Sequence, residues 1–235
     1  MTLIAHLENI SHGVGLDYFG VANLARAIGF IRQQGGDLPA SFPRAVSVGV
    51  AVPYGLTAPL LANDNDNSAL MNYDWYVYKV CNPMLDQSTL RLSREIENAG
   101  YRAMPVATSL AIQDKHLAGV FSHKLAAHLA GLGWIGKNCL LINPEDGPRV
   151  RWGTVLTDAP LETGNLLERN CGKCTECAKA CPSGAIHGTA FDPAEPRVKR
   201  LDVDKCNEYR NSLQSSIGAP TCGKCLAACP FGRIK

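Results

Sequence analysis

The sequence lacks the features of a membrane or exported protein. Its two most apolar stretches, AVSVGVAVPYGL and LAGLGWIGKNCLLI, are shorter than the roughly 20 residues that a transmembrane helix needs. The first residues, MTLIAHLENISHG, carry no basic stretch before an apolar core, and the chain has no twin-arginine pair. We therefore expect a cytoplasmic protein that crosses no membrane.

The sequence also lacks an excess of charge of one sign. Its 23 basic and 21 acidic side chains give a net charge of +2, which is too small to attract nucleic acid or an anionic membrane by itself. The 235 residues, 46% of them hydrophobic, suffice for one large folded domain or two smaller ones.

Long apolar runs become rare after about residue 165, where Cys, Gly, Pro and Lys dominate. Before that point, stretches with helical spacing alternate with valine-rich stretches typical of buried strands. The predicted helices lie near 2–11, 22–34, 71–100 and 121–131, and Pro83 is expected to divide the third of them. The predicted strands lie at 16–22, 44–52, 101–107, 138–142 and 150–156. The last two strands flank the turn residues NPEDGP and are predicted to form a hairpin. We expect an α+β protein, with an α/β layered domain over residues 1–163 and a smaller domain over 164–235.

The chain is rich in cysteine, with ten residues, of which seven lie in two motifs and an eighth, Cys206, precedes the second motif. The first motif, CGKCTECAKACP at 171–182, has the spacing C-x2-C-x2-C-x3-C-P, which is typical of bacterial ferredoxins that bind [4Fe–4S] clusters. The second, CGKCLAACP at 222–230, follows Cys206 after fifteen residues. Eight ligands suffice for two clusters, so residues 164–235 are predicted to form a ferredoxin-like domain.

In two-cluster ferredoxins the last cysteine of each motif binds the cluster of the other motif. This crossed pattern predicts a first cysteine set of Cys171, Cys174, Cys177 and Cys229, and a second cysteine set of Cys181, Cys206, Cys222 and Cys225. A zinc module is the alternative, although zinc sites usually use two C-x2-C pairs separated by a longer loop. Cys81 and Cys139 lie in apolar segments outside both motifs and are expected to be buried in packing.

Clusters of this kind transfer single electrons and need an acceptor. Either residues 1–163 hold a second redox centre, or the chain passes electrons to another protein. The sequence LAAHLAGLGWIGKNCLLINPEDGPRVRWGTVLTDAPL, together with both cysteine motifs, resembles the epoxyqueuosine reductase family, corrinoid-dependent iron–sulfur enzymes related to reductive dehalogenases. The likeness covers about residues 120–230, and DYFGVANL, PRAVSVGV and GYRAMPV are similar to the amino-terminal domain of that family.

The resemblance implies a cobalamin held between the two domains as the electron acceptor. Glycines in AGLGWIGKN would allow close approach of its ring, and the other side chains would supply apolar and polar contacts. The predicted contact residues are Gly131, Gly133, Trp134, Ile135, Gly136, Lys137 and Asn138. Spacing alone favours a simpler interpretation, in which the glycines end a helix and turn the chain into a strand.

Two departures from the family pattern bear on function. The acidic segment that carries the family's proposed proton donor is replaced by QDKHLAGVFSHK. His116 stands at the matching position, and other placements of the alignment gap put Thr108, Ser109 or Asp114 there. An exposed loop histidine without a catalytic role is the plainer interpretation of His116. The chain also lacks the helical repeat domain with which that family binds tRNA, which argues against tRNA as substrate. We expect a reductase of a small or nucleoside-like molecule that takes electrons from a ferredoxin- or flavodoxin-type donor. The alternative is an electron-transfer protein without corrinoid that docks a partner enzyme.

Other side chains allow two interpretations each. Tyr73, Trp75, Tyr76 and Tyr78 could line a corrin or substrate pocket, or form the buried face of an amphipathic helix. Arg149 and Arg151 could bind an anion, but a solvated hairpin end is the favoured interpretation. His123 and His128 are five residues apart, which is not the spacing that places two metal ligands on one helical face.

Overall fold

The structure is a computed structural model that describes residues 1–62, 67–110 and 118–233. Its contacts divide the chain into two compact units. Unit 1 contains Met1–Ala51, Cys81–Gly133 and Arg151–Leu167, and unit 2 contains Val52–Val80, Trp134–Val150 and Glu168–Lys235. The grouping is interleaved because segments 52–80 and 134–150 pack with the cysteine-rich segment. The boundary between 163 and 164, as the limit of two separately folding domains, stays a prediction.

Unit 1 is built on a four-stranded sheet with the strand order β1-β2-β6-β3. The strands are β1 (Tyr18–Asn23), β2 (Arg44–Ala51), β6 (Val150–Thr157) and β3 (Ala103–Val106). β1 pairs antiparallel with β2, with Tyr18 opposite Gly49, and β3 pairs antiparallel with β6, with Val106 opposite Thr154. β6 is central and buried along almost its whole length, which explains its continuous apolar sequence.

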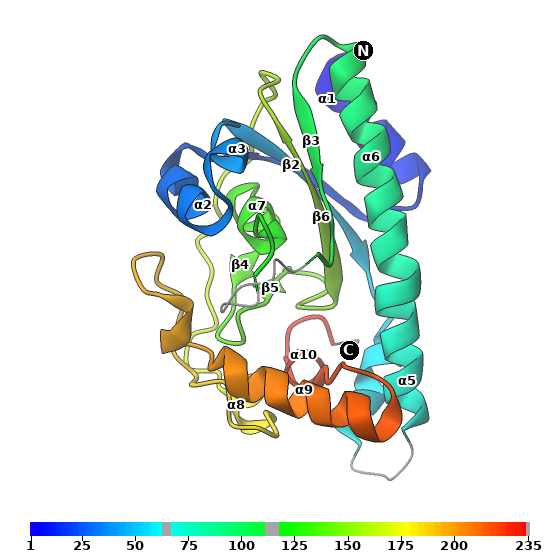
Figure 1. Cartoon of the computed structure of the whole chain (residues 1–235), viewed down its shortest axis with the longest axis vertical. Helices are drawn as coiled ribbons and strands as arrows, with labels where there is room; N and C mark the ends of the chain where they lie inside the picture. Colours follow the sequence, from blue (N-terminus) through cyan, green and yellow to red (C-terminus); the bar gives the residue numbers. More distant parts are fainter. Residues whose placement is uncertain (63–66, 111–117, 234–235) are drawn as a thin grey trace. The chain divides into compact units, whose positions relative to one another are not determined.

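Helices cover both faces of this sheet (Figure 1). Helix α6 (Asn82–Asn98) packs along one face together with α1 (Leu3–Gly13), and Gly153 of β6 admits Leu85 and Thr89 of α6 close to the strand. On the other face, α2 (Ile28–Gly35), α3 (Asp37–Ala40) and α7 (His123–Leu129) enclose a core. That core includes Leu24, Ile31, Phe42, Ala126 and Leu156.

Unit 2 consists of short helices and one small sheet. The helices are α4 (Tyr54–Thr57), η2 (Ala58–Leu61), α5 (Ser68–Trp75), α8 (Glu176–Lys179), η4 (Arg197–Lys199), α9 (Val203–Ile217) and α10 (Lys224–Ala227). Strands β4 (Trp134–Ile135) and β5 (Leu141–Ile142) pair antiparallel. Helix α9 begins at Asp202, whose side chain accepts a hydrogen bond from the Lys205 amide, and ends at Gly218 in the left-handed conformation, as expected of helix caps. A π-helical turn, η3 (Tyr76–Cys81), leads from α5 into α6.

The predicted hairpin of residues 138–142 with 150–156 is wrong. β5 pairs with β4, whereas β6 lies in the four-stranded sheet. A strand buried on both faces has partners on both edges, and β6 finds them in β2 and β3. The turn residues instead close a tight loop, in which the amides and carbonyls of Asn143 and Gly147 exchange hydrogen bonds. No helix in the described ranges is both long enough and apolar enough to cross a membrane.

Candidate metal centre

The first cysteine motif folds as a tight loop followed by one helical turn. The Asn170 side chain accepts a hydrogen bond from the Gly172 amide, and Gly172 has a φ of 51°, which favours glycine. The Cys174 amide then donates to the Cys171 carbonyl. Helix α8 places Cys177 on its inner side, and the Cys181 amide ends it by donating to Ala178. Two-residue spacings thus turn three thiols toward one space.

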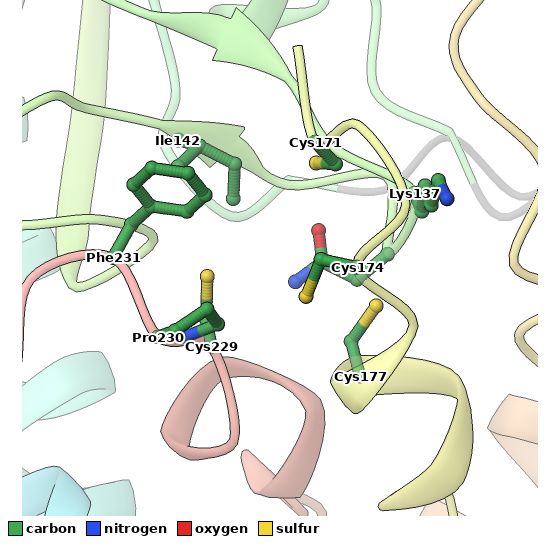
Figure 2. A pocket seen from close by; sticks show the side chains of 9 residues that line it. Lys137, Ile142, Cys171, Cys174, Cys177, Cys229, Pro230 and Phe231 are labelled. Atoms are coloured by element: carbon green, nitrogen blue, oxygen red, sulfur yellow. The ribbon is translucent and has the colours of Figure 1, made fainter.

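The first cysteine set lines one pocket in unit 2. Cys171, Cys174 and Cys177 come from the motif loop and α8, and Cys229 comes from the end of the second motif. The pocket has an empty volume of about 280 Å³, including the part open to solvent, and its other lining residues are Lys137, Asn138, Ile142, Pro230 and Phe231. Figure 2 shows the four sulfur atoms around this space, with Phe231 and Ile142 on one side and Lys137 on the other.

The protein alone does not favour ionised thiols at this pocket. Burial, followed by the charges of Cys171 and Cys174, raises the pKa of Cys177. Burial also raises the pKa of Cys229 to about 12, and the neighbouring cysteines add to it although the Phe231 amide opposes it. Thiolates here therefore require a bound cation, because iron or another metal replaces the proton on sulfur.

The second cysteine set gathers from three segments of unit 2. Cys206 stands on α9, Cys225 on α10, and Cys222 just before α10, while Cys181 follows α8. Burial, and then the charges of Cys222 and Cys206, raises the pKa of Cys225. The pKa of the Cys222 thiol is likewise raised by burial and by Cys181 and Cys206. These mutual effects mean that the four thiols are neighbours.

Cys181 differs from the other members of its set. Although burial raises its pKa, hydrogen bonds from the Ser183 hydroxyl and from the amides of Ala185, Ile186 and Ser183 lower it below the usual value. Backbone N–H groups directed at a cysteine sulfur are a common means of stabilising negative charge at iron–sulfur sites.

The donor set and its spacing fit a multi-iron cluster. Each set offers four thiols and no imidazole, and the first set surrounds a cavity instead of meeting at one point. Among the residues of the described ranges, no three His, Cys, Asp or Glu side chains are placed to hold a single metal ion. Zinc would draw four sulfurs to about 2.3 Å from one centre, whereas a cluster occupies the space between its ligands.

The segment AGLGWIGKN is divided between the two units. Gly131 follows α7 in unit 1 and has a φ of 78°, and a Cβ on it would lie 2.2 Å from the Asn165 carbonyl oxygen. The Gly133 carbonyl accepts a hydrogen bond from His128 Nδ1 at 3.1 Å. A Cβ on Gly136 would lie within 3.0 Å of side-chain atoms of Asn138 and Ile142. The protein's own packing therefore accounts for glycine at positions 131 and 136.

The second half of this segment lies against the first cysteine set. Trp134 packs edge-on against Phe231, with ring centroids 4.9 Å apart, and its buried Nε1 has no hydrogen-bond partner among the described residues. Asn138 Nδ2 donates to the Cys225 carbonyl at 3.3 Å, and its Oδ1 accepts from the Leu140 amide. Ile135 is partly exposed. The segment thus supports the cysteine module from within unit 2.

The predicted proton donor His116 lies outside the described residues, and so does Asp114. Thr108 and Ser109, which different gap placements put at the same position, lie just after β3 in a polar group that sequence reasoning missed. The Asp86 carboxylate accepts from the Thr108 amide and hydroxyl at 2.9 and 3.0 Å. Asn82, at the start of α6, donates to the Ser109 hydroxyl and accepts from Arg151 at 2.9 and 3.2 Å.

His123 completes this polar group in unit 1. Its Nε2–H donates to the Ala107 carbonyl at 3.2 Å, so Nδ1 accepts from the Thr154 hydroxyl at 2.8 Å. Burial, assisted by the charge of Arg151, lowers the pKa of His123 to about 4. The ring is therefore neutral at pH 7. The pairing of β3 with β6 and the packing of α6 and α7 beside these strands bring the residues together, so no local sequence pattern could have indicated them.

Arg149 is not the solvated hairpin end that the sequence favoured. It is 8% exposed, and its guanidinium donates to the carbonyls of Val52 and Gly232 and to the Asp146 carboxylate. It also lies over the Tyr54 ring. Arg149 thereby connects three segments of unit 2, one of which follows Cys229 directly. The sequence could not show that Arg149 is buried, because its partners Val52 and Gly232 lie far from it in the chain.

The aromatic residues near α5 do not share one buried face. Tyr73 is 4% exposed and lies against Gly223, while Trp75 and Tyr76 are 61% and 45% exposed. Cys81 and Cys139 are buried and belong to neither cysteine set.

Comparison with known proteins agrees with the module and the fold. A family described as a 4Fe-4S double cluster binding domain matches residues 170–232, which contain both cysteine sets. An epoxyqueuosine reductase from Aliivibrio fischeri is 30% identical over 158 residues, covering 66% of this chain and 40% of that protein. The chain is a homologue of the epoxyqueuosine reductases. A second such reductase, from Listeria monocytogenes, is 35% identical over 118 residues, covering 49% of this chain and 31% of that protein.

The chain therefore spans 40% or less of the length of these epoxyqueuosine reductases. The solved epoxyqueuosine reductase of Streptococcus thermophilus matches with a TM-score of 0.62 at 20% identity, covering all of this chain and 67% of that one. A reductive dehalogenase, whose structure suggests a mechanism for B12-dependent dehalogenation, matches with a TM-score of 0.68 at 19% identity, covering 97% and 31%. These likenesses confirm the predicted α+β fold. The matched double-cluster domain supports the binding of [4Fe–4S] clusters by residues 170–232.

Proposed function

We propose that this chain is an epoxyqueuosine reductase-like oxidoreductase, in which two [4Fe–4S] clusters pass electrons to a cobalamin that reduces a small or nucleoside-like substrate. The proposal assigns one cluster to each cysteine set. The observation that carries it is the gathering of eight thiols, seven from two distant motifs and one from Cys206, into two neighbouring groups of four inside unit 2. The clusters supply one-electron transfer at low potential when bound.

Backbone donors offset part of the cost of negative charge at these positions. The Phe231 amide and the amides after Cys181 donate to sulfur, which stabilises thiolate ligands. Trp134, Ile142 and Phe231 exclude water from one side of the first cysteine set. Asn138, which lines the pocket of the first cysteine set, donates a hydrogen bond to the carbonyl of Cys225 in the second set. This bond connects the protein around one set with the backbone of the other. A low-potential donor of the ferredoxin or flavodoxin type is the proposed electron source, and the cytoplasm is the proposed compartment.

The cobalamin is supported by the fold shared with a B12-dependent dehalogenase. Its proposed contacts remain the predicted residues from Gly131 to Asn138, and its proposed proton donor remains His116. An electron-transfer protein without corrinoid is the second candidate, because several of those contact residues already have partners within the protein. Gly131 and Gly136 face protein atoms, and the Asn138 side chain is bonded at both ends.

Anaerobic reconstitution with iron and sulfide, followed by cobalamin and desalting, separates these candidates. The reductase predicts two cluster signals in EPR after reduction, together with one cobalamin retained per chain and a cobalt signal. The electron-transfer protein predicts the same cluster signals and no retained cobalamin. Preparations that bind zinc and no iron would refute both.

The substrate requires its own test. A related reductase has been solved with an epoxyqueuosine-modified tRNA stem loop, so the same chemistry on tRNA is the outcome to check first. Cells that lack epoxyqueuosine reductase would regain queuosine if this chain acts on tRNA, alone or with a second subunit. We expect no restoration, because the net charge of +2 gives little attraction for RNA.

A further inference from the structure

Cys206 is the one member of the second cysteine set that neither motif supplies. It stands on α9, a helix of 15 residues, all of them described, and none of those residues is buried. A helix in a protein owes most of its stability to the packing of an apolar face. Because α9 buries no side chain fully, its position depends on its polar contacts, and so does the position of Cys206.

The beginning of α9 is tied to the segment that follows the first motif. The Asp202 amide donates to the Ala185 carbonyl at 2.9 Å, and Ile186 forms an antiparallel bridge with Leu201. The amides of Ala185 and Ile186 in turn donate to the Cys181 sulfur. These are backbone contacts, so this end of the helix is held beside Cys181 whatever side chains α9 carries.

Arg210 holds the helix on the other side of Cys206. It follows Cys206 by one helical turn, so the two side chains lie on the same face of α9. Its Nε donates to the Pro220 carbonyl at 2.7 Å, and Pro220 stands two residues before Cys222. Hydrogen bonds with a charged donor are among the stronger ones in proteins. Arg210 therefore connects the helix that carries one ligand with the segment that carries the next.

The charge of Arg210 also acts on the Cys206 sulfur. Burial raises the pKa of the Cys206 thiol, the positive charge of Arg210 opposes this rise, and the charge of Cys181 adds to it. Lys205, the residue before Cys206, is placed differently, because its side chain is 60% exposed and lies 3.7 Å from the Asp202 carboxylate. Solvent and this carboxylate screen its charge. Of these two cations, Arg210 is the one that favours the thiolate of Cys206, which is the form that binds iron.

We propose that Arg210 is the positioning residue of the second cluster, because its bond to Pro220 holds Cys206 on the iron that the motif cysteines do not reach. The other three ligands of this set, Cys181, Cys222 and Cys225, belong to the two motifs. The inference rests on the iron–sulfur part of the proposed function and does not depend on cobalamin.

An iron that is poorly held by its cysteine is the one that a [4Fe–4S] cluster loses on oxidation. One electron passes to the oxidant, one Fe²⁺ leaves, the freed Cys206 thiolate takes up a proton, and a three-iron cluster remains on the other three ligands. Arg210 therefore protects the second cluster from oxidative loss of iron.

The test is limited oxidation of the reconstituted full chain by ferricyanide, which accepts the electron, under otherwise anaerobic conditions. A ferrous chelator follows the rate at which Fe²⁺ leaves, and EPR detects the three-iron cluster, since an intact oxidised [4Fe–4S] cluster gives no signal. Arg210→Met removes the donors and the charge, and Arg210→Lys keeps the charge and one donor group. Lys205→Met is the matched control, because it removes an exposed charge beside Cys206. Arg210→Met is also made in a Cys206→Ala chain, where only the first cluster can release iron.

We expect Arg210→Met to release iron about tenfold faster than wild type and to give the three-iron signal. Tenfold corresponds to about 1.4 kcal/mol, close to the lower end of what a hydrogen bond with a charged group contributes. Arg210→Lys should stay within about threefold of the wild-type rate, and Lys205→Met should change it less than about twofold, because its charge is screened. In the Cys206→Ala chain, Arg210→Met should leave the rate unchanged.

An unchanged rate in an Arg210→Met protein that retains both clusters would overturn the inference and leave the proposed function intact. An equal acceleration in the Cys206→Ala chain would overturn it too, because the effect would then belong to the first cluster. If Arg210→Met takes up the first cluster only, Arg210→Lys decides: a regained second cluster supports the inference, and its absence refutes it. Loss of both clusters in Arg210→Met also refutes it. Wild-type protein without cluster signals would instead refute the proposed function.

Discussion

Replacement of Arg149 by methionine tests whether one buried side chain holds unit 2 together. Methionine keeps much of the apolar stem but removes every donor. The Val52 and Gly232 carbonyls and the Asp146 carboxylate then lose their partner. Removal of one member of a buried charge pair costs about 3–5 kcal/mol, and Asp146 is 26% exposed, so water recovers part of that cost. We expect a loss of about 3–4 kcal/mol.

The assay is the rate at which the anaerobic holoprotein loses its clusters in urea, followed by absorbance. A rate is preferred because unfolding with cofactor loss is not a reversible two-state process. A loss of about 3 kcal/mol changes an equilibrium constant by more than a factor of about 100, so even a partial contribution to the barrier gives at least a roughly tenfold faster loss. Arg32→Met, which breaks an exposed ion pair with Asp37, is the control and should change the rate less than about threefold. Equal rates for both variants would contradict the assignment of Arg149 as a buried connector.

The remaining predictions concern the cluster ligands, a glycine and a histidine. Cys206→Ala should remove one of two cluster signals and about half of the iron, whereas Cys139→Ala should keep both; equal iron in the two variants would count against the second cysteine set. Gly131→Ala should destabilise the protein by about 2–4 kcal/mol without any cobalamin present, measured as a lower urea midpoint, because its φ is 78° and a Cβ would meet the Asn165 carbonyl. His123 has a pKa of about 4 in the folded protein, below its unfolded value of about 6.5. As the pH falls, the unfolded chain therefore binds a proton on His123 at a higher pH than the folded chain does. The contribution of neutral His123 to the free energy of unfolding is present in full above pH 6.5 and is lost as the pH falls toward 4. At pH 5 the loss is about 2 kcal/mol. The urea midpoint of His123→Gln should therefore fall less than that of wild type between pH 7 and pH 5.

The sequence alone indicated the cofactor class and most of the secondary structure of unit 1, whereas it did not predict a helix at Val203–Ile217, where α9 forms. Ligands of a cluster stand at fixed short spacings because a single loop must wrap a small inorganic core, so C-x2-C-x2-C-x3-C-P carries its chemistry in twelve adjacent residues. Valine-rich and helical spacings are equally local, and β1, β2, β3, α1 and α7 lie close to their predicted positions. The resemblance to epoxyqueuosine reductases rested on adjacent residues as well.

Only the tertiary structure decided which residues surround the cysteines. The sequence favoured a solvated turn for Arg149, and its contacts with Val52 and Gly232 became known only from the structure. Lys137 was predicted as a cobalamin contact, and only the structure places it in the lining of the pocket of the first cysteine set. The partner of β6 was predicted incorrectly for the same reason: a buried strand needs two neighbours, and the sequence does not say which segments supply them. Burial and pairing depend on contacts between residues far apart in the chain, and no local pattern encodes the partner.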